Sequence, residues 1–477
     1  MKKLKLFLEN FLIYGFSGIL SKIIPLIMVP IVTRLMPDSS YFGISDMQST
    51  LISFGSALAI LGMYDAMYRM FFEREEEEYR KEICSTSLSF ILILSVAVAL
   101  IMVILKEPLS SLFFKDRNLS WLVSLAAVTT LVSTTNSLVS APTRMQNRRK
   151  IFVIMNALGP LLSYSVAIPL LLSGHYIIAL PLAALISGAF GETVFWILNR
   201  NWFSIEMIKK QYLRPLLKIA VPLFPIFIVY WVFNSSDRLM ITQLLGTSET
   251  GLYSVGSKLG HASQLIYTAF AGGWQYFAFS TMREDDQVES NSKVFEYLGV
   301  ISFSATAFIC ALARPIYRLL FTAEYASSYI VSPYLFLAPL LLMLYQVGAN
   351  QFLVIKKTWP NLLILASGAI CNIILNFILI PRIGIEGAAI ATLAGYIVSD
   401  VVCAIVLIKM KLMVLSKEFI LSSVLMLILF VMWRTITLES TGFSIGMALV
   451  FSCIWAFIYK KPLKAFFSAI NNGRDKD

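Results

Sequence analysis

Long apolar runs, separated by short polar segments, follow one another along the whole chain. A helix needs about 20 consecutive, mostly apolar residues to cross the hydrocarbon core of a bilayer. By this measure the pattern predicts about fourteen membrane spans. They cover residues 11–32, 42–63, 84–105, 121–141, 151–173, 177–198, 219–245, 252–281, 294–313, 329–355, 362–380, 388–408, 419–436 and 443–458. The sequence therefore predicts an all-α polytopic membrane protein.

The amino-acid composition supports this interpretation. Of the 477 residues, 58% are apolar and only 14% are charged. Soluble domains contain about 25% charged residues. Water cannot solvate so much apolar surface, so lipid must be the solvent. The segments between the expected spans are too short to form a soluble catalytic domain.

The distribution of positive charge predicts the orientation. A net charge of +11 in a soluble protein would suggest nucleic-acid binding. Here the cations gather in the loops on one side of the membrane. With the N-terminus in the cytoplasm, the cytoplasmic segments hold about 28 Lys and Arg residues and the opposite loops about 8. We therefore expect both termini in the cytoplasm, basic cytoplasmic loops at 144–150 and 200–218, and no nucleic-acid partner.

The chain also looks doubled. Residues 34–43 and 245–251 each form a short turn with a late glycine, followed by a helix that carries a polar stripe. Six spans per half is an even number, so the halves share one orientation and form a parallel repeat. We expect an N-lobe at 1–215, a C-lobe at 216–410, and two further spans with a cytoplasmic tail at 411–477. Transporters built from such repeats bind their substrates near the membrane midplane, between the repeats.

Polar side chains recur at helical spacing within some of the expected spans. Asp46 is followed by Ser49 and Ser53 on one helix face, and Lys258 and His261 lie on the eighth span. Charged side chains are costly inside a membrane and usually face a water-filled cavity or a partner. Alternatively, serines bond to their own helix or pack at close helix contacts. Similar stripes on the first two spans of each half favour a central cavity.

Two kinds of site are expected there. The expected substrate-binding residues are Lys22, Arg34, Asp46, Asp237, Arg238, Lys258 and His261, and the expected ion-coupling residues are Asp46, Asp237 and Asp400. Asp237 and Arg238 are adjacent and point about 100° apart on a helix, so they need not pair with each other. The deep cations suit an anionic substrate. The five cysteines lie singly, so no metal site, disulfide framework or cofactor is expected.

Several segments resemble a known family, in the same order along the chain. They are residues 25–43, 62–69, 221–225, 237–238, 245–246, 251–254, 274, 372, 376, 380–381 and 384–392. Together they resemble the polysaccharide-transporter branch of the multidrug/oligosaccharidyl-lipid/polysaccharide exporter superfamily, the Wzx-type flippases of O-antigen and capsule repeat units.

The resemblance implies a two-lobed transporter of the bacterial inner membrane. It would carry a polyprenyl-diphosphate-linked oligosaccharide to the outer leaflet for surface polysaccharide synthesis, driven by antiport of a proton or sodium ion. Its partners would be membrane lipids and the polysaccharide polymerase and chain-length machinery. The cavity cations would meet the diphosphate or acidic sugars.

Other functions stay open at this point. A lipid II flippase or a drug/cation antiporter would have the same fold, although an antiporter for cations would be expected to line its cavity with net acid. A membrane enzyme would be expected to carry a long external loop with reactive groups. The longest expected external loops, 106–120 and 314–328, contain no nucleophile–base arrangement. The sequence therefore favours a transporter over an enzyme.

Overall fold

The computed structural model describes residues 22–460, apart from 269, 271–273, 275–277, 279–281, 283, 356 and 358. Every regular element in this part of the chain is a helix. Packing divides the chain into a first unit, Met1–Val255 with Ala369–Thr392, and a second unit, Gly256–Gly368 with Leu393–Asp477. These units follow from contacts, whereas the lobes 1–215 and 216–410 follow from the repeat, and the lobes stay a prediction.

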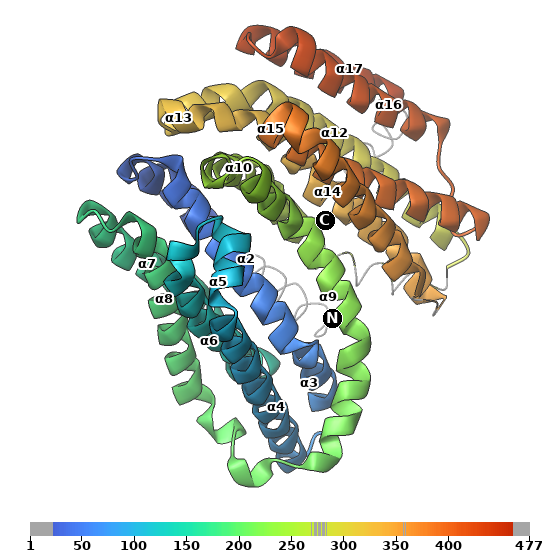
Figure 1. Ribbon diagram of the computed structural model, residues 1–477. Helices are drawn as coiled ribbons and strands as arrows, with labels where there is room; N and C mark the ends of the chain where they lie inside the picture. The colour runs from blue at the N-terminus through green and yellow to red at the C-terminus, as the bar shows by residue number, and fades with distance from the viewer. Residues whose placement is uncertain are drawn as a thin grey trace. The chain divides into compact units, whose positions relative to one another are not determined.

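The helices can be followed in Figure 1. Residues 22–35 are helical. The α-helices after them are α2 (Ser39–Ile60), α3 (Met63–Phe71), α4 (Glu77–Ile104), α5 (Lys106–Phe114), α6 (Ser120–Met145), α7 (Arg149–Leu172), α8 (Tyr176–Asn199), α9 (Lys210–Leu244), α10 (Thr247–Gly260), α12 (Gln287–Leu320), α13 (Ala323–Ala326), α14 (Ser332–Val354), α15 (Trp359–Lys409), α16 (Lys417–Met432) and α17 (Thr441–Ile458).

Ten of the described helices are long and apolar enough to cross a membrane. The pair α2 and α3, bent by 48° at Leu61–Gly62, would make eleven. The prediction of an all-helical protein with many spans is therefore confirmed. The expected spans 11–32 and 252–281 lie partly outside the described residues, so the count of about fourteen stays a prediction.

Helix α15 is too long for one span. Its 51 residues would measure roughly 77 Å at 1.5 Å per residue, against a hydrocarbon core of about 30 Å. Ile383 and Gly384 have non-helical backbone angles, and Gly384 has a φ of 63°. Glycine adopts this left-handed conformation without a steric penalty. The break divides α15 into two arms, which correspond to the expected spans 362–380 and 388–408.

In the first unit, α6 packs against α2, α4 and α8, and α3 packs against α4 and α9. Figure 1 shows α4, α6 and α8 lying side by side. One buried cluster, which includes Met67, Phe71 and Ile83, fills the space around α3. The α2 residues Met47 and Leu51 belong to a second cluster. These two clusters fix α2 and α9, which carry the candidate site.

Three of the expected loops are partly helical. Residues 106–120 contain α5 and a 3₁₀ turn at Arg117–Leu119, and Lys210–Ala220 forms the first three turns of α9. Residues 314–328 contain the end of α12 and all of α13. The Lys and Arg residues in the second segment lowered its hydropathy below that of a span, although these residues favour helices.

In the second unit, α12 packs against α14, α16 and α17. The buried Glu296 on α12 accepts hydrogen bonds from the Ser416 backbone N–H at 2.6 Å and the Ser416 hydroxyl at 2.7 Å. Ser416 also caps the first turn of α16 by accepting from the Phe419 backbone N–H. The first turn of α16 is thereby fastened to α12.

Within the first unit, α2 touches the start of α10 backbone to backbone. A methyl group on Gly43 would overlap the Thr247 carbonyl oxygen, and one on Gly251 would overlap the Ser39 carbonyl oxygen. The Ser39 and Ser248 hydroxyls are 2.5 Å apart at the same crossing. Only glycine permits this approach, because any Cβ would push the helices apart.

We therefore predict that Gly43→Ala and Gly251→Ala each destabilise the protein, by about 1–3 kcal/mol for the overpacking. The measurement is the thermal unfolding midpoint of the purified protein in detergent. Gly446→Ala on α17, where no atom lies within 4 Å of a new methyl, is the matched control and should leave the midpoint unchanged. Unaltered midpoints for both crossing variants would contradict the close contact.

Candidate functional site

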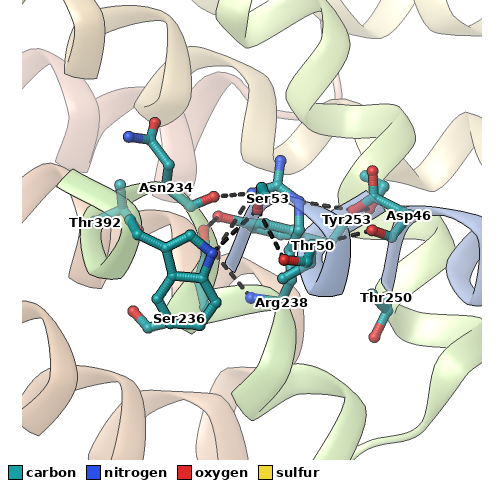
Figure 2. A network of polar contacts seen from close by, with 12 residues as sticks. Asp46, Thr50, Ser53, Asn234, Ser236, Arg238, Thr250, Tyr253 and Thr392 are labelled. Carbon is teal, nitrogen blue, oxygen red and sulfur yellow. Dashed lines mark hydrogen bonds and ion pairs between the residues drawn. The ribbon is translucent and has the colours of Figure 1, made fainter. Parts of the chain in front are cut away.

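A buried arginine, Arg238 on α9, lies at the centre of the polar network in Figure 2. Its Nε is 2.7 Å from Asp46 Oδ2 on α2. One terminal nitrogen is 3.6 Å from Asp237 Oδ1 on α9 itself. The side chains of Arg238 and Asp46 are each 12% exposed and that of Asp237 is 4% exposed. One guanidinium is therefore shared by two carboxylates in a largely dry setting.

Each carboxylate has a further partner on α10. The Ser254 hydroxyl donates to Asp46 Oδ2 at 2.6 Å, and the Tyr253 hydroxyl donates to Asp237 Oδ2. The Tyr253 ring also lies against the guanidinium, 5.8 Å from centroid to Cζ, within cation–π range. Tyr253 and Ser254 are both fully buried. Helix α10 thus supplies hydroxyl donors that stabilise the ionised acids.

The backbone of α9 holds the arginine in place. Arg238 donates from a terminal nitrogen to the Asn234 carbonyl one turn earlier, and the Thr242 hydroxyl donates to the Arg238 carbonyl at 2.9 Å. Thr242 also meets Thr250 of α10, with 2.7 Å between the hydroxyl oxygens. These contacts fasten α9 to α10 within the first unit and limit the rotamers open to Arg238.

A second set of polar groups continues the network onto α15. Ser236 on α9 donates to the Asn372 amide oxygen at 3.1 Å, and the Asn372 amide nitrogen donates to Thr392 at 3.1 Å. Asn376 donates to the same Asn372 oxygen at 3.2 Å. Asn372 and Thr392 lie on opposite sides of the break in α15, so this set joins its two arms. All of these groups are neutral hydrogen-bonding groups.

The serine stripe on α2 has two kinds of role. Ser49 donates to the Ser45 carbonyl and Ser53 to the Thr50 carbonyl, which is the local back-bonding that competed with the cavity interpretation. Ser53 also accepts from the Trp231 indole N–H of α9 at 3.1 Å. Asp46 is the charged residue of the stripe, and it forms the ion pair with Arg238.

The cluster mixes acidic and basic groups, and the acidic groups outnumber the arginine. Arg238 stays charged at any relevant pH. With both acids ionised, the cluster of Arg238, Asp46 and Asp237 carries a net charge of −1. The free-energy cost of removing a charge from water is offset only when the charge is paired and hydrogen-bonded. The expectation that adjacent Asp237 and Arg238 need not pair was wrong, because the long arginine side chain folds back toward its neighbour.

The predicted site residues are brought together in part. Asp46, Asp237 and Arg238 meet in the first unit, where Lys22 and Arg34 also lie, both exposed. The half-buried Lys258 and His261 and the buried Asp400 belong to the second unit. Within the described residues, no group of three or more His, Cys, Asp or Glu side chains is placed to hold a metal ion.

Sequence reasoning missed the roles of three residues in this network. Tyr253 and Trp231 look like ordinary aromatic residues of an apolar span, and nothing in their spacing marks their hydrogen bonds. Thr392 likewise carries no signal by itself. Asn372 and Asn376 did carry one, because two amides four residues apart inside an apolar run are costly unless they find partners.

The fold is that of a known class of membrane transporters. The chain matches the lipid II flippase MurJ in an inward closed conformation, with 15% identity, a TM-score of 0.70, and coverage of 95% of this chain and 99% of that one. It also matches an inward-facing multidrug resistance MATE family transporter of the MOP superfamily, with 14% identity, a TM-score of 0.62, and coverage of 83% of this chain and 98% of that one. A mutant MATE transporter from Vibrio cholerae matches with 14% identity and a TM-score of 0.61, and the match covers 86% of this chain and 98% of that one. At these identities the likeness shows the fold alone.

The family is shown by sequence. The family model described as "Polysaccharide biosynthesis protein" matches residues 31–330, which is more than half of the chain. The chain therefore belongs to this polysaccharide biosynthesis family, and the resemblance inferred from its motifs is confirmed at that level. No curated protein matched the chain in sequence.

We predict that the ion-pair cluster is strongly coupled. Arg238→Gln should destabilise the protein by about 3–5 kcal/mol, because it leaves two buried carboxylates without their cation. Asp46→Asn should cost less, because Asp237 remains. The double variant should be less destabilised than the sum of the single changes by about 1–3 kcal/mol. Thermal unfolding midpoints in detergent give all three values.

Arg382→Gln, at an exposed arginine of the first unit, is the matched control and should change stability by less than about 0.5 kcal/mol. Strictly additive losses for the two single variants would show that Arg238 and Asp46 do not interact in the folded protein.

Proposed function

We propose that this chain flips a polyprenyl-diphosphate-linked oligosaccharide repeat unit across the bacterial inner membrane, for the synthesis of a surface polysaccharide such as O-antigen, capsule or exopolysaccharide. The family supplies the biosynthetic context, and the transporter fold supplies a means of crossing the membrane. Movement would occur by alternating access, with the two predicted lobes opening to one side at a time. In this proposal both termini lie in the cytoplasm.

The observation that carries this proposal is Arg238, a permanent cation inside a membrane span whose carboxylate partners are replaceable. Arginine presents a planar fork of donors that suits the oxygens of a diphosphate as well as those of a carboxylate. The Asp46 carboxylate, at 2.7 Å from Nε, occupies a position that a diphosphate oxygen would take. The headgroup would therefore bind by exchanging with Asp46.

Such an exchange gives a simple route to ion coupling. When the headgroup displaces Asp46, the freed carboxylate needs a new counter-charge, and a proton or sodium ion supplies one. When the headgroup leaves, Arg238 reclaims Asp46 and the ion is expelled. The headgroup and the ion would thus bind together, with a coupling free energy that acts equally in both directions. This joint binding differs from the antiport that the family resemblance implies. Asp237, held by Tyr253, would keep Arg238 in position during the exchange.

The other predicted site residues have subordinate roles in this proposal. Lys22 and Arg34, both exposed, would attract the acidic headgroup or sugars. Lys258 and His261 would act in the second unit on the same cargo. Membrane lipids would surround the protein, and the polymerase and chain-length machinery would take up the product.

We predict that Arg238→Gln lowers surface polysaccharide by about ten- to hundredfold, which corresponds to the loss of about 1.5–3 kcal/mol for charged hydrogen bonds to the headgroup. The test returns variants to a bacterium from which the gene has been deleted and measures surface polysaccharide and inner-leaflet lipid-linked repeat units. Arg238→Lys keeps the charge and should retain intermediate export. Arg382→Gln is the control and should export normally.

Normal export by Arg238→Gln, at equal protein in the membrane, would reject the role of Arg238. Normal polysaccharide after deletion of the gene would reject the flippase proposal itself. The fold likeness to MurJ makes lipid II the second candidate cargo. Rescue of cells depleted of their lipid II flippase would favour that cargo over a polysaccharide repeat unit.

We also predict the side of the membrane on which residues 144–150 lie. In a Cys453→Ser background, which removes the exposed native thiol, Arg148→Cys should react with an impermeant maleimide only after the cytoplasmic face is opened. Arg117→Cys, also exposed, is the opposite-side control and should react in intact cells. The reverse pattern would overturn the predicted orientation.

A further inference from the structure

The second unit contains a buried carboxylate of its own, whereas the Arg238 cluster belongs to the first unit. Asp400 lies in the second arm of α15, nine residues before the helix ends at Lys409. At 1.5 Å per residue this places it roughly 13 Å from that end, well inside a span. Its side chain is buried, with 9% of the residue exposed. Among the described residues, neither of its carboxylate oxygens has a hydrogen-bond partner.

Asp400 lines an apolar cavity of about 290 Å³. The cavity lies between α12, α14, α15 and α16, and its walls include Phe295, Leu341 and Phe419. The other polar side chain among its described lining residues is Ser423, whose hydroxyl donates to the Phe419 carbonyl at 3.0 Å. The surroundings thus contain space for water but little that could stabilise a negative charge.

Among the described lining residues of the cavity, Asp400 is the one charged group. Glu296, next to Phe295 on α12, is held by Ser416. Lys417 and Glu418 begin α16 and are exposed. The lining residues from α14 are leucines. On α15 itself, the Cys403 thiol is the ionisable neighbour that interacts with Asp400. Among the residues that the structure describes, no cation bonds to Asp400 as Arg238 bonds to Asp46.

This site is poorly suited to bind a metal ion. Hard cations prefer about six or more oxygen ligands, and the described lining offers the two Asp400 oxygens and one serine hydroxyl. A proton needs one oxygen. A buried carboxyl group without a partner is tolerated far better as the neutral acid than as an anion.

We propose that Asp400 is a proton-binding site of the transport cycle, separate from the headgroup-binding cluster at Arg238. This proposal rests on the proposed function, adds a second ion site to the one proposed at Asp46, and names the ion at Asp400 as a proton. The carboxylate takes a proton from hydronium when water enters the cavity and becomes the neutral acid as α15 and α16 close on it. Loss of the proton leaves a bare anion, which draws water back between the helices.

The test is infrared difference spectroscopy on the full-length protein in lipid vesicles. A protonated carboxylic acid has a C=O stretching band that a carboxylate lacks. At neutral pH the wild type should show such a band from Asp400, and raising the pH should remove it. Asp400→Asn, which mimics the neutral acid in shape, should lack the band at every pH. Asp285→Asn, at an exposed acid of the same unit, is the control and should match the wild type.

Asp400→Glu, which retains an acid, keeps the test decisive if the asparagine variant fails to fold, because its band should persist at a shifted frequency. Identical carboxylic-acid bands in the wild type and Asp400→Asn would overturn the proposal, as would an unshifted spectrum in Asp400→Glu. The measurement needs no cargo, so its failure is distinct from failure of the flippase proposal, which the gene deletion tests.

Discussion

The sharing of one guanidinium between two carboxylates is the interaction on which the architecture of the first unit depends. Arg238, Asp46 and Asp237 each cost free energy to place inside a membrane, and the cost is offset only if α2, α9 and α10 are in register. The glycine contact between α2 and α10 brings Ser254 to Asp46, and the hydroxyl pair Thr242–Thr250 brings Tyr253 to Asp237. Packing and electrostatics therefore fix the same three helices. A change in the charge of either acid therefore alters the packing free energy of all three helices.

This dependence bears on the proposed exchange of Asp46 for a headgroup. A buried ion pair contributes little net stability but makes the loss of either partner expensive. A ligand that replaced one carboxylate would therefore cost little net free energy, whereas an arginine left without any anion would be strongly disfavoured. The neutral groups Ser236, Asn372 and Thr392 stand beside the cluster and do not alter its charge. They would preserve the helix positions if the charged partners changed as proposed.

The general fold and three of the site residues could be predicted from the sequence because both follow from the cost of polar groups in lipid. That cost acts residue by residue, so Asp46, Asp237 and Arg238 stand out in apolar runs without any knowledge of packing. Their pairing could not be predicted in the same way, since Asp46 and Arg238 are far apart along the chain and meet only through helix packing. Tyr253 and Trp231 escaped notice because a hydroxyl or indole on an aromatic ring hardly changes hydropathy. The helical start of α9 was missed because hydropathy reports burial in lipid and says nothing about backbone conformation.

The break at Ile383–Gly384 has a consequence for how the chain can be divided. Asn372 and Thr392 clasp the two arms of α15 together across the break, and the residues at the turn, 381–383, are exposed. The connection between the arms thus depends on side chains as well as on the peptide bond. A chain severed at this turn would retain the clasp, so α15 offers a natural seam for producing the protein as two complementary fragments.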